Sequence, residues 1–202
     1  MKIIGLCGQS GAGKTTALEV FSRHGFGVID CDLVSREVMS AGSGCLVELA
    51  GHFGEEILSN NGTLKRQALA DIAFSSPEHL QALNAITHKY ILREVFARLD
   101  AFGKEGVRVA VVDAPVLFES GLDKSCDTTL AICADSEKRV ERIVARDGID
   151  PERARARIER QLSEKELSEL CDRVIYNNST IEDLESAVEA YAQEIGDSLE
   201  KT

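Results

Sequence analysis

Short apolar runs alternate with amphipathic stretches along most of the chain. The runs are short, mostly apolar and often rich in β-branched residues, as buried strands are; they cover residues 3–7, 27–32, 107–113, 128–133 and 172–178. The longer stretches between them carry apolar residues at the three- and four-residue spacing of helices. Strands that alternate with helices predict an α/β fold with a five-stranded parallel sheet flanked by helices.

The segment between the second and third predicted strands is too long for a simple crossover. It covers residues 33–106 and holds several helical patterns. Ser76-Pro77-Glu78 is a strong helix start, because serine caps, proline suits the first helical position and an acid follows. An apolar stripe from Leu80 to Leu99 continues that helix. We therefore predict a helical region inserted into the sheet domain.

Two further helices are predicted beside the sheet. Residues 15–24 carry apolar side chains at helical spacing directly after the first strand. The last helix follows a cap at Ser179 or Thr180. We expect the chain to fray from about Gly196.

The connection between the first strand and the first helix has the composition of a phosphate-binding loop. Residues 8–15 are Gly-Gln-Ser-Gly-Ala-Gly-Lys-Thr and fit the pattern G-x-x-x-x-G-K-[ST] without a mismatch. The glycines let several N–H groups turn inward, and the helix dipole adds positive potential there. Lys14 can reach the outer phosphates of a nucleoside triphosphate, and Thr15 can ligand Mg²⁺. A chance glycine-rich turn is the alternative, but the flanking strand and helix favour a nucleotide site.

Three aspartates follow apolar strands, where a parallel sheet faces its ligand. The two-residue period of a strand sends Asp30 and Asp32 to the same side, where they can hold a metal or accept a proton from an acceptor hydroxyl. Alternatively, Asp30 only caps the helix that starts near Leu33. Asp113 ends the clearest strand, as the Mg²⁺-binding aspartate of a nucleoside triphosphatase does, although it can equally begin a loop.

The segment from Ser136 to Gln161 is locally basic, with one lysine and seven arginines against six acids. Arg139, Arg142 and Arg146 lie on one helix face, Asp147 to Pro151 break the helix, and the spacing of Arg153, Arg157 and Arg160 repeats the pattern. Arginine binds phosphate oxygens through two parallel hydrogen bonds, so this pattern predicts a lid over the phosphates. The alternative is a solvated, salt-bridged helix pair, because Glu137, Glu141 and Glu159 are close.

Length, charge and composition exclude several functional classes. The 202 residues suit one domain of moderate size, and a formal net charge of −11 argues against nucleic-acid binding. No apolar run approaches the roughly 18 residues of a membrane span. The N-terminus has no leader pattern, so we expect a cytoplasmic protein without membrane partners.

The six cysteines form no C-x-x-C pair and are expected to be free thiols, with Cys7, Cys31 and Cys133 in the core. Oligomeric state stays open.

Short motifs extend over nearly the whole chain. The phosphate loop alone is common to many families, but the combination of motifs is more specific. The motifs are the loop at 8–16, Val28-Ile29-Asp30-Cys31-Asp32 with Arg36-Glu37-Val38, Phe53-Gly54, Gly62-Thr63-Leu64-Lys65-Arg66 with Leu69, Ile86-Thr87-His88, Pro115-Val116-Leu117-Phe118-Glu119, Arg142 and Arg146 with Asp147-Gly148, Arg157-Ile158-Glu159-Arg160-Gln161, and Val174-Ile175-Tyr176-Asn177. With this combination the chain resembles the dephospho-coenzyme A kinase family over nearly its whole length.

The resemblance implies a P-loop kinase with strand order 2-3-1-4-5 and three parts. These are a nucleotide-binding core (1–32, 107–135 and 171–202), a helical acceptor-binding region (33–106) and a lid (136–170). It implies transfer of the ATP γ-phosphoryl group to the ribose 3′-hydroxyl of dephospho-CoA, the last step of coenzyme A biosynthesis, with ATP and Mg²⁺ as co-substrate and cofactor.

Site roles follow from the residue patterns above together with this resemblance, which implies the role of Asp32 in particular. The expected catalytic residues are Asp32 as general base, Lys14, Arg142 and Arg146. The expected ATP contacts are Gly8, Gly11, Ala12, Gly13, Lys14, Thr15, Thr16 and Asn177. The expected acceptor contacts are Asp32, Arg36, Arg66 and His88, and the expected metal ligands are Thr15, Asp30 and Asp113.

Some positions depart from the family pattern. Lys89 and Val116 stand where the family commonly has proline and leucine, and Asn178-Ser179 replaces a usual glycine. The first two departures touch the acceptor side and leave its contacts open.

Other functions remain as alternatives. Another nucleoside or nucleotide kinase of this architecture is the nearest, and an ATPase module is more distant. A GTP switch would need an Asn/Thr-Lys-x-Asp motif and an Asp-x-x-Gly motif after the third strand, and the chain has neither.

Overall fold

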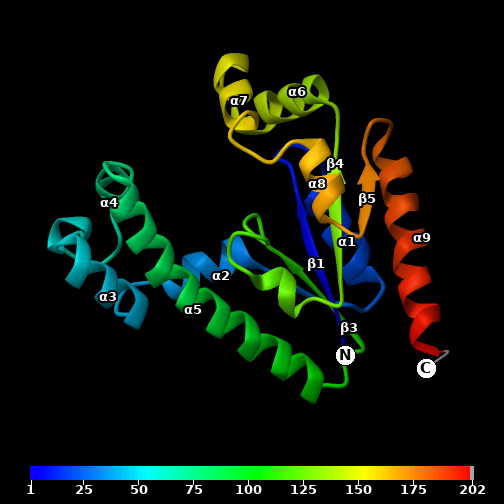
Figure 1. Cartoon of the computed structure of the whole chain (residues 1–202), viewed down its shortest axis with the longest axis horizontal. Helices are drawn as coiled ribbons and strands as arrows, with labels where there is room; N and C mark the ends of the chain where they lie inside the picture. The colour runs from blue at the N-terminus through cyan, green and yellow to red at the C-terminus, as the bar shows by residue number, and fades with distance from the viewer. Residues whose placement is uncertain (201–202) are drawn as a thin grey trace. The chain divides into compact units, whose positions relative to one another are not determined.

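The computed structural model describes residues 1–200. The chain forms two compact units (Figure 1). Among the described residues, the first comprises 1–29 and 102–200, and the second 30–101. The boundaries predicted from the sequence, at 33 and 106, lie a few residues later along the chain.

A five-stranded parallel sheet forms the centre of the first unit. Its order is β2-β3-β1-β4-β5, the order that the family resemblance implied. The central strand β1 runs parallel to both β3 and β4, and β4 runs parallel to β5. The strands are β1 (Lys2–Gly8), β2 (Gly27–Asp30), β3 (Val109–Asp113), β4 (Thr128–Cys133) and β5 (Arg173–Tyr176).

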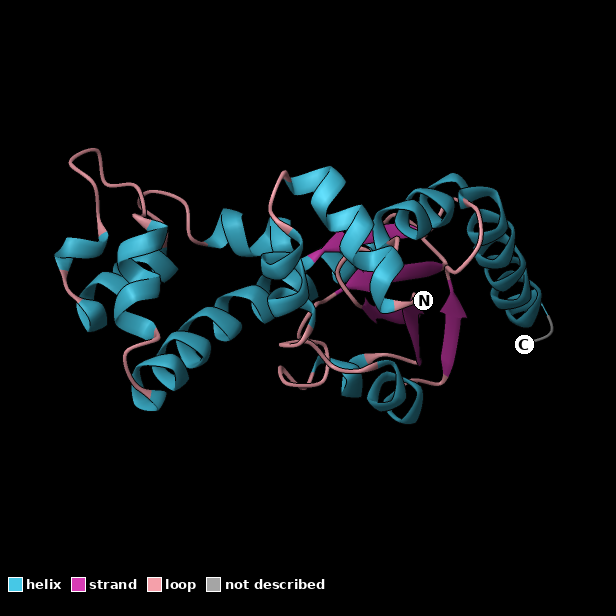
Figure 2. Cartoon of the chain, turned by 90° about the horizontal axis from the view of Figure 1, so that it is seen from above, coloured by secondary structure: helices cyan, strands magenta, loops and turns pink. Residues whose placement is uncertain are grey.

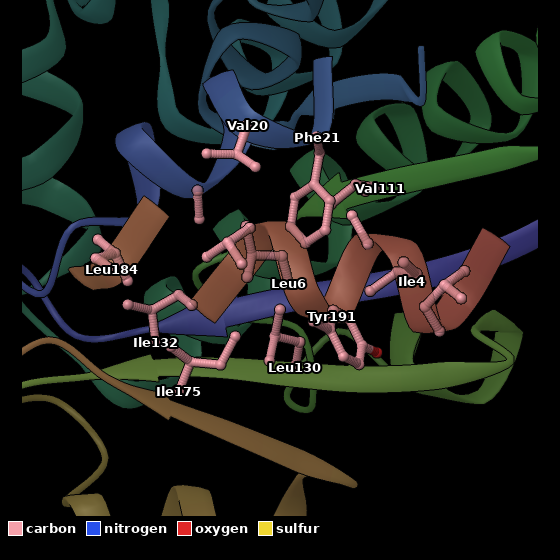
Figure 3. Close-up of a cluster of buried hydrophobic side chains, with 14 of the residues drawn as sticks. Ile4, Leu6, Val20, Phe21, Val111, Leu130, Ile132, Ile175, Leu184 and Tyr191 are labelled. Atoms are coloured by element: carbon pink, nitrogen blue, oxygen red, sulfur yellow. The ribbon is translucent and has the colours of Figure 1, made fainter. Parts of the chain in front are cut away.

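Helices α1 (Lys14–Arg23) and α9 (Ile181–Glu200) cover one face of this sheet. Alternation along the strands sends Ile4 and Leu6 of β1 to that face, where they meet Phe21 and Tyr191 (Figure 3). The predicted cap of α9 is Thr180, whose hydroxyl accepts a hydrogen bond from the Asp183 N–H. This continuous apolar core fixes β1, and with it the loop that follows β1.

Three helices lie between β4 and β5 in the sequence. They are α6 (Ser136–Asp147), α7 (Pro151–Ile158) and α8 (Glu164–Leu170), and a short 3₁₀ helix, η2 (Leu122–Ser125), precedes β4. Gly148 ends α6 in the left-handed conformation, and the Asp150 carboxylate caps α7, as predicted. The pair α6–α7 has a small core of its own around Ile143 and Ala154.

The second unit is helical (Figure 2). It contains α2 (Cys31–Val38), α3 (Gly44–Phe53), η1 (Glu55–Ile57), α4 (Arg66–Ala73) and most of α5 (Pro77–Lys104). Its core gathers around Leu49, Phe53 and Leu69, against which α5 packs an apolar face. The inserted helical region and the long helix from Pro77 are therefore confirmed.

The structure corrects several local predictions. Strand β2 ends at Asp30 and Asp32 lies in the first turn of α2, so the two-residue period does not relate these carboxylates. Helix α7 ends at Ile158, which leaves Arg160 outside the predicted arginine face. Helix α9 continues to Glu200, so the predicted fraying is wrong for residues 196–200, and residues 201–202 lie outside the described part.

No helix within residues 1–200 combines the length and the apolar character needed to cross a bilayer.

Candidate active site

The phosphate loop connects β1 to α1 in a conformation that requires glycine. Gly8 has φ +137° and Gly13 has φ +105°. A Cβ on Gly8 would lie 2.3 Å from the Ile132 carbonyl oxygen, and one on Gly13 would lie 2.6 Å from the Asn177 side-chain nitrogen. The loop is therefore pressed between β4 and the end of β5, and any side chain at these two positions would displace it.

The loop and the N-terminus of helix α1 together carry groups that suit an anion. The Lys14 ammonium donates a hydrogen bond to the Gly8 carbonyl at 3.3 Å, which draws its charge back over the loop. The first turn of α1 contains no acid, so no carboxylate of that turn offsets the positive potential of the helix N-terminus. Thr15 is exposed in that turn and Thr16 is half-buried. Backbone N–H groups, one ammonium and a hydroxyl thus gather where phosphates would bind.

Arg139 and Gln161 hold the tip of the loop, and we call this pair the loop clamp. Arg139 is only 3% exposed, and its Nε donates to the Ser10 carbonyl at 3.0 Å. The Gln161 side-chain oxygen accepts from the Ser10 N–H at 3.0 Å and from the Arg139 guanidinium at 2.9 Å. Burial lowers the pKa of Arg139. A buried guanidinium therefore acts here as a donor to the loop.

A second pair of side chains holds the base of the loop. Asn177 is 5% exposed, and its amide donates to the Ala12 carbonyl at 2.8 Å. Arg142 donates to the Gly11 carbonyl at 3.2 Å and to the Asn177 backbone and side-chain oxygens at 3.2 and 3.3 Å. Arg142 thus lies at the phosphate loop, as the predicted lid arginine should, and also positions it.

The remaining lid arginines mostly form exposed ion pairs. Arg146 and Arg157 both pair with Asp147, and hydrogen bonds from Arg146 are the main reason that the pKa of Asp147 is lowered. Arg155 of α7 pairs with Glu137 of α6. The salt-bridged alternative therefore describes these side chains as they stand, while Arg139 and Arg142 face the loop.

The predicted carboxylates occupy different settings. Asp113 ends β3 in a buried position, in register with Leu6 of β1, two residues before the phosphate loop. Asp30 caps α2, because its carboxylate accepts from the N–H groups of Asp32 and Leu33 at 2.8 and 3.1 Å. The capping alternative is thus confirmed for Asp30. Asp32 is exposed in the first turn of α2, with its carboxylate outside that cap.

The second unit contains a pocket of about 240 Å³ that includes one predicted acceptor residue. Exposed Arg66 lies at its wall beside mainly apolar side chains; the full lining is Ser35, Met39, Leu64, Arg66, Leu69, Ala70, Phe74, Leu83, Asn84 and Thr87. His88 and Arg36 are neighbours in sequence of lining residues but are not part of the lining. Lys89, at the position where the family commonly has proline, pairs with Glu48 at 2.7 Å.

Hard oxygen donors suit Mg²⁺, and the predicted metal ligands supply a hydroxyl and carboxylates. Among residues 1–200, no three His, Cys, Asp or Glu side chains are grouped to hold a metal on their own. A magnesium ion that travels with a nucleotide needs only one or two protein donors, because phosphates and water complete its shell. The donor set around Thr15 and Asp113 is compatible with that requirement.

Sequence reasoning missed the loop clamp. Arg139 was recognised only as one of several arginines on a helix face, and Gln161 only as part of a motif. Both are more than 120 residues from Ser10. No local pattern distinguishes an arginine that holds a loop from one that faces water.

A phosphate loop after the central strand, the strand order 2-3-1-4-5 and a helix α6 whose Arg139 and Arg142 bond to that loop define a P-loop kinase. The sequence model of the family described as dephospho-CoA kinase matches residues 2–183. The chain belongs to the dephospho-CoA kinase family.

Individual relatives agree with this assignment. The dephospho-CoA kinase of Corynebacterium glutamicum is 40% identical over 192 residues, which cover 95% of this chain and 96% of the relative. The crystal structure of TT1252 from Thermus thermophilus superposes with a TM-score of 0.81 at 32% identity, covering 96% and 97% of the two chains. Dephospho-CoA kinase from Campylobacter jejuni shares the fold, with a TM-score of 0.72 at 24% identity over 98% and 99% of the chains.

Proposed function

We propose that this protein is an ATP-dependent dephospho-CoA kinase. It transfers the γ-phosphoryl group of ATP to the ribose 3′-hydroxyl of dephospho-CoA and releases coenzyme A and ADP, as the last step of coenzyme A biosynthesis. The observation that carries the proposal is the phosphate loop held by lid arginines, in a chain that the dephospho-CoA kinase family matches from residue 2 to 183.

The nucleotide binds to the first unit. Its phosphates lie on the loop N–H groups and the N-terminus of α1, with Lys14 on the outer phosphates. Arg142 exchanges its bonds to loop carbonyls for phosphate oxygens, and Arg146 leaves Asp147 to join it. Two planar cations then offset the charge that develops on the transferred group. Asn177 keeps the loop in its binding conformation and borders the adenine site.

Magnesium supplies charge neutralisation at the β- and γ-phosphates when it is bound with ATP. Thr15 and Asp113 are the residues that would hold it, because an exposed hydroxyl in the first turn of α1 and a carboxylate at the end of β3 are hard donors. The Asp30 carboxylate already accepts two backbone hydrogen bonds. We therefore expect Asp30 to contribute less to metal binding than Thr15 and Asp113.

The acceptor binds to the second unit. The largely apolar pocket suits the pantetheine arm of dephospho-CoA, and Arg66 at its wall suits the diphosphate. Arg36 and His88 add donors beside this pocket. Asp32, which is exposed in the first turn of α2, orients the 3′-hydroxyl and accepts its proton.

The lid contributes by excluding water. An acceptor hydroxyl and a water molecule are similar nucleophiles, so a kinase must close over its phosphates to avoid hydrolysis. Helices α6 and α7 move as one body, since they share a small apolar core and an Arg155–Glu137 ion pair.

The test is ADP release by the full chain with ATP and Mg²⁺. The acceptor panel contains dephospho-CoA, AMP, adenosine, pantetheine and no acceptor. We expect stimulation by dephospho-CoA alone and a product phosphorylated at the 3′-oxygen. Stimulation by AMP or adenosine instead would retain the kinase chemistry and remove the acceptor assignment. A rate that no acceptor changes would indicate an ATPase.

Asp32→Asn tests the general base. It should reduce turnover by a factor on the order of 10² or more while leaving ATP affinity unchanged, because Asp32 contacts the acceptor and not the nucleotide. Asp71→Asn, an exposed carboxylate of α4 in the same unit, is the matched control. If both variants keep the parent turnover, another residue accepts the proton.

A further inference from the structure

Two thiols meet directly behind the phosphate loop, and the phosphoryl-transfer chemistry uses neither. Cys7 is the residue before Gly8, near the end of β1, and Cys171 ends α8. Their sulfur atoms are 3.4 Å apart, although 164 residues separate them in sequence. Both residues belong to the first unit, so the contact lies within one compact body.

Strand alternation explains why thiols gather at this place. Ile4 and Leu6 face α1 and α9, so Cys7 faces the opposite side of the sheet. The same alternation in β4 places Cys133 on that side, since Leu130 and Ile132 belong to the α1–α9 core. Within residues 1–200 no group of three His, Cys, Asp or Glu side chains is arranged for a metal. Two thiols in such close contact can be oxidised to a disulfide.

The two thiols differ in access and in ionisation. Cys7 is 3% exposed, whereas Cys171 is partly exposed to solvent. A hydrogen bond from the Cys7 thiol, with a further one from Thr129, lowers the pKa of Cys171. The same contact, together with burial, raises the pKa of Cys7. Cys171 is therefore the thiol that a small oxidant reaches more easily, and Cys7 is the resolving thiol beside it.

We propose that Cys7 and Cys171 form a reversible disulfide on exposure to hydrogen peroxide, and that this bond weakens ATP binding by displacing the phosphate loop.

The reaction has two balanced steps. The Cys171 thiolate attacks one oxygen of hydrogen peroxide, the O–O bond breaks, and hydroxide leaves to take up a proton as water. The product is a sulfenic acid on Cys171. The Cys7 sulfur then attacks the Cys171 sulfur, the S–S bond forms, the S–O bond breaks, and the Cys7 proton leaves with the hydroxide as a second water. The two thiols lose two electrons and peroxide gains them.

The bond acts on the loop because closing it requires movement. A disulfide needs about 2.05 Å between sulfur atoms, so the pair must approach by about 1.3 Å. At Gly8 the backbone is already in close contact with Ile132 and has little room to adjust. The segment that carries Cys171 also reaches the loop from its other end, where the Leu162 carbonyl accepts from the Gln9 side chain at 3.1 Å. Displacement of either partner therefore changes the loop.

The experiment uses the reduced full chain, hydrogen peroxide, peptide mass spectrometry and binding of ATP with Mg²⁺. We expect a mass loss of about 2 Da and a linked peptide pair containing Cys7 and Cys171. The dissociation constant for ATP should rise roughly threefold or more, and dithiothreitol should restore it. This binding readout does not depend on the proposed acceptor, so it is separate from the test of the proposed function.

Cys171→Ser and Cys7→Ala should bind ATP like the reduced parent and lose the response to peroxide. Cys45→Ser, which changes a buried thiol of the second unit, should respond like the parent. Failure to find the linked peptides in the oxidised parent would overturn the proposal. This measurement uses the parent chain, so it does not depend on whether any variant folds. It would also be overturned if the linked protein bound ATP unchanged, or if Cys171→Ser lost affinity on oxidation as the parent does.

Discussion

Replacing Gln161 with leucine would test whether the loop clamp controls the phosphate loop. Leucine has a similar volume and no polar atoms, so the substitution removes the amide without leaving a large cavity. Three contacts disappear: those from the Ser10 N–H and the Arg139 guanidinium to the amide oxygen, and that from the amide nitrogen to the Ser10 hydroxyl. Arg139 then keeps its bond to the Ser10 carbonyl but loses the Gln161 oxygen as an acceptor.

The magnitude follows from the burial of the groups left behind. Ser10 is half-buried, so water can replace its lost bonds at small cost. Arg139 is buried and charged, and losing one of its two partners dominates the effect. We estimate about 2–3 kcal/mol for the sum. For a chain of this size, that lowers the unfolding temperature by roughly 5–10 °C. If about half of that free energy holds the loop in its binding conformation, ATP affinity falls roughly tenfold.

The assay is thermal unfolding with and without ATP, together with steady-state kinetics. KM for ATP should rise more than kcat falls, because Gln161 contacts the loop and not the transferred group. Gln67→Leu is the matched control: it removes an exposed glutamine whose side chain donates to Asp71 at the surface, and should change stability by about 0.5 kcal/mol or less. If the two variants behave alike in both measurements, the loop clamp does not have the role that we assign to it.

Two further predictions concern the sheet around the loop. Gly8→Ala should abolish ATP binding and lower the unfolding temperature, because its Cβ would meet the Ile132 backbone. Gly25 also has a positive φ but has open space around it, so Gly25→Ala should lower stability and leave ATP binding unchanged. Calorimetry and nucleotide titration would measure these two effects. Hydrogen bonds from Thr129, backbone first, lower the pKa of Asp172. Asp172 therefore stabilises the fold above its unfolded pKa and loses this effect as pH falls through its folded pKa. Asp172→Asn should make stability depend less on pH below about pH 4. The same fall in stability at acid pH in the variant and the parent would contradict this prediction.

Much of the fold and of the nucleotide site could be predicted from sequence, because the signals are local. The strand at Thr128–Cys133 was predicted with the bounds that the structure shows, since an apolar run between turns needs no tertiary information. Asp150 and Pro151 start α7 where capping chemistry places them. The phosphate loop is a contiguous motif, and its anion site arises from backbone that the same few residues control.

Local signals fail where two periodicities compete. The two-residue period predicts Asp30 and Asp32 on one side of a strand, but the chain changes from strand to helix between them. The Asp30 carboxylate makes that change possible by accepting the first N–H groups of α2. The sequence allows a capping role for Asp30 as an alternative, and only the structure shows that Asp30 caps α2.

The sequence by itself therefore determined the five strands, the inserted helical region, the phosphate loop and the family. Tertiary structure alone decided which arginines face the loop, because Arg139 and Arg155 have the same chemistry and differ only in what packs around them. It alone brought Cys7 to Cys171, through strand alternation and a parallel sheet that joins distant segments. The physical reason is that a periodicity specifies which face a residue occupies, whereas its partner on that face is set by how the whole chain packs.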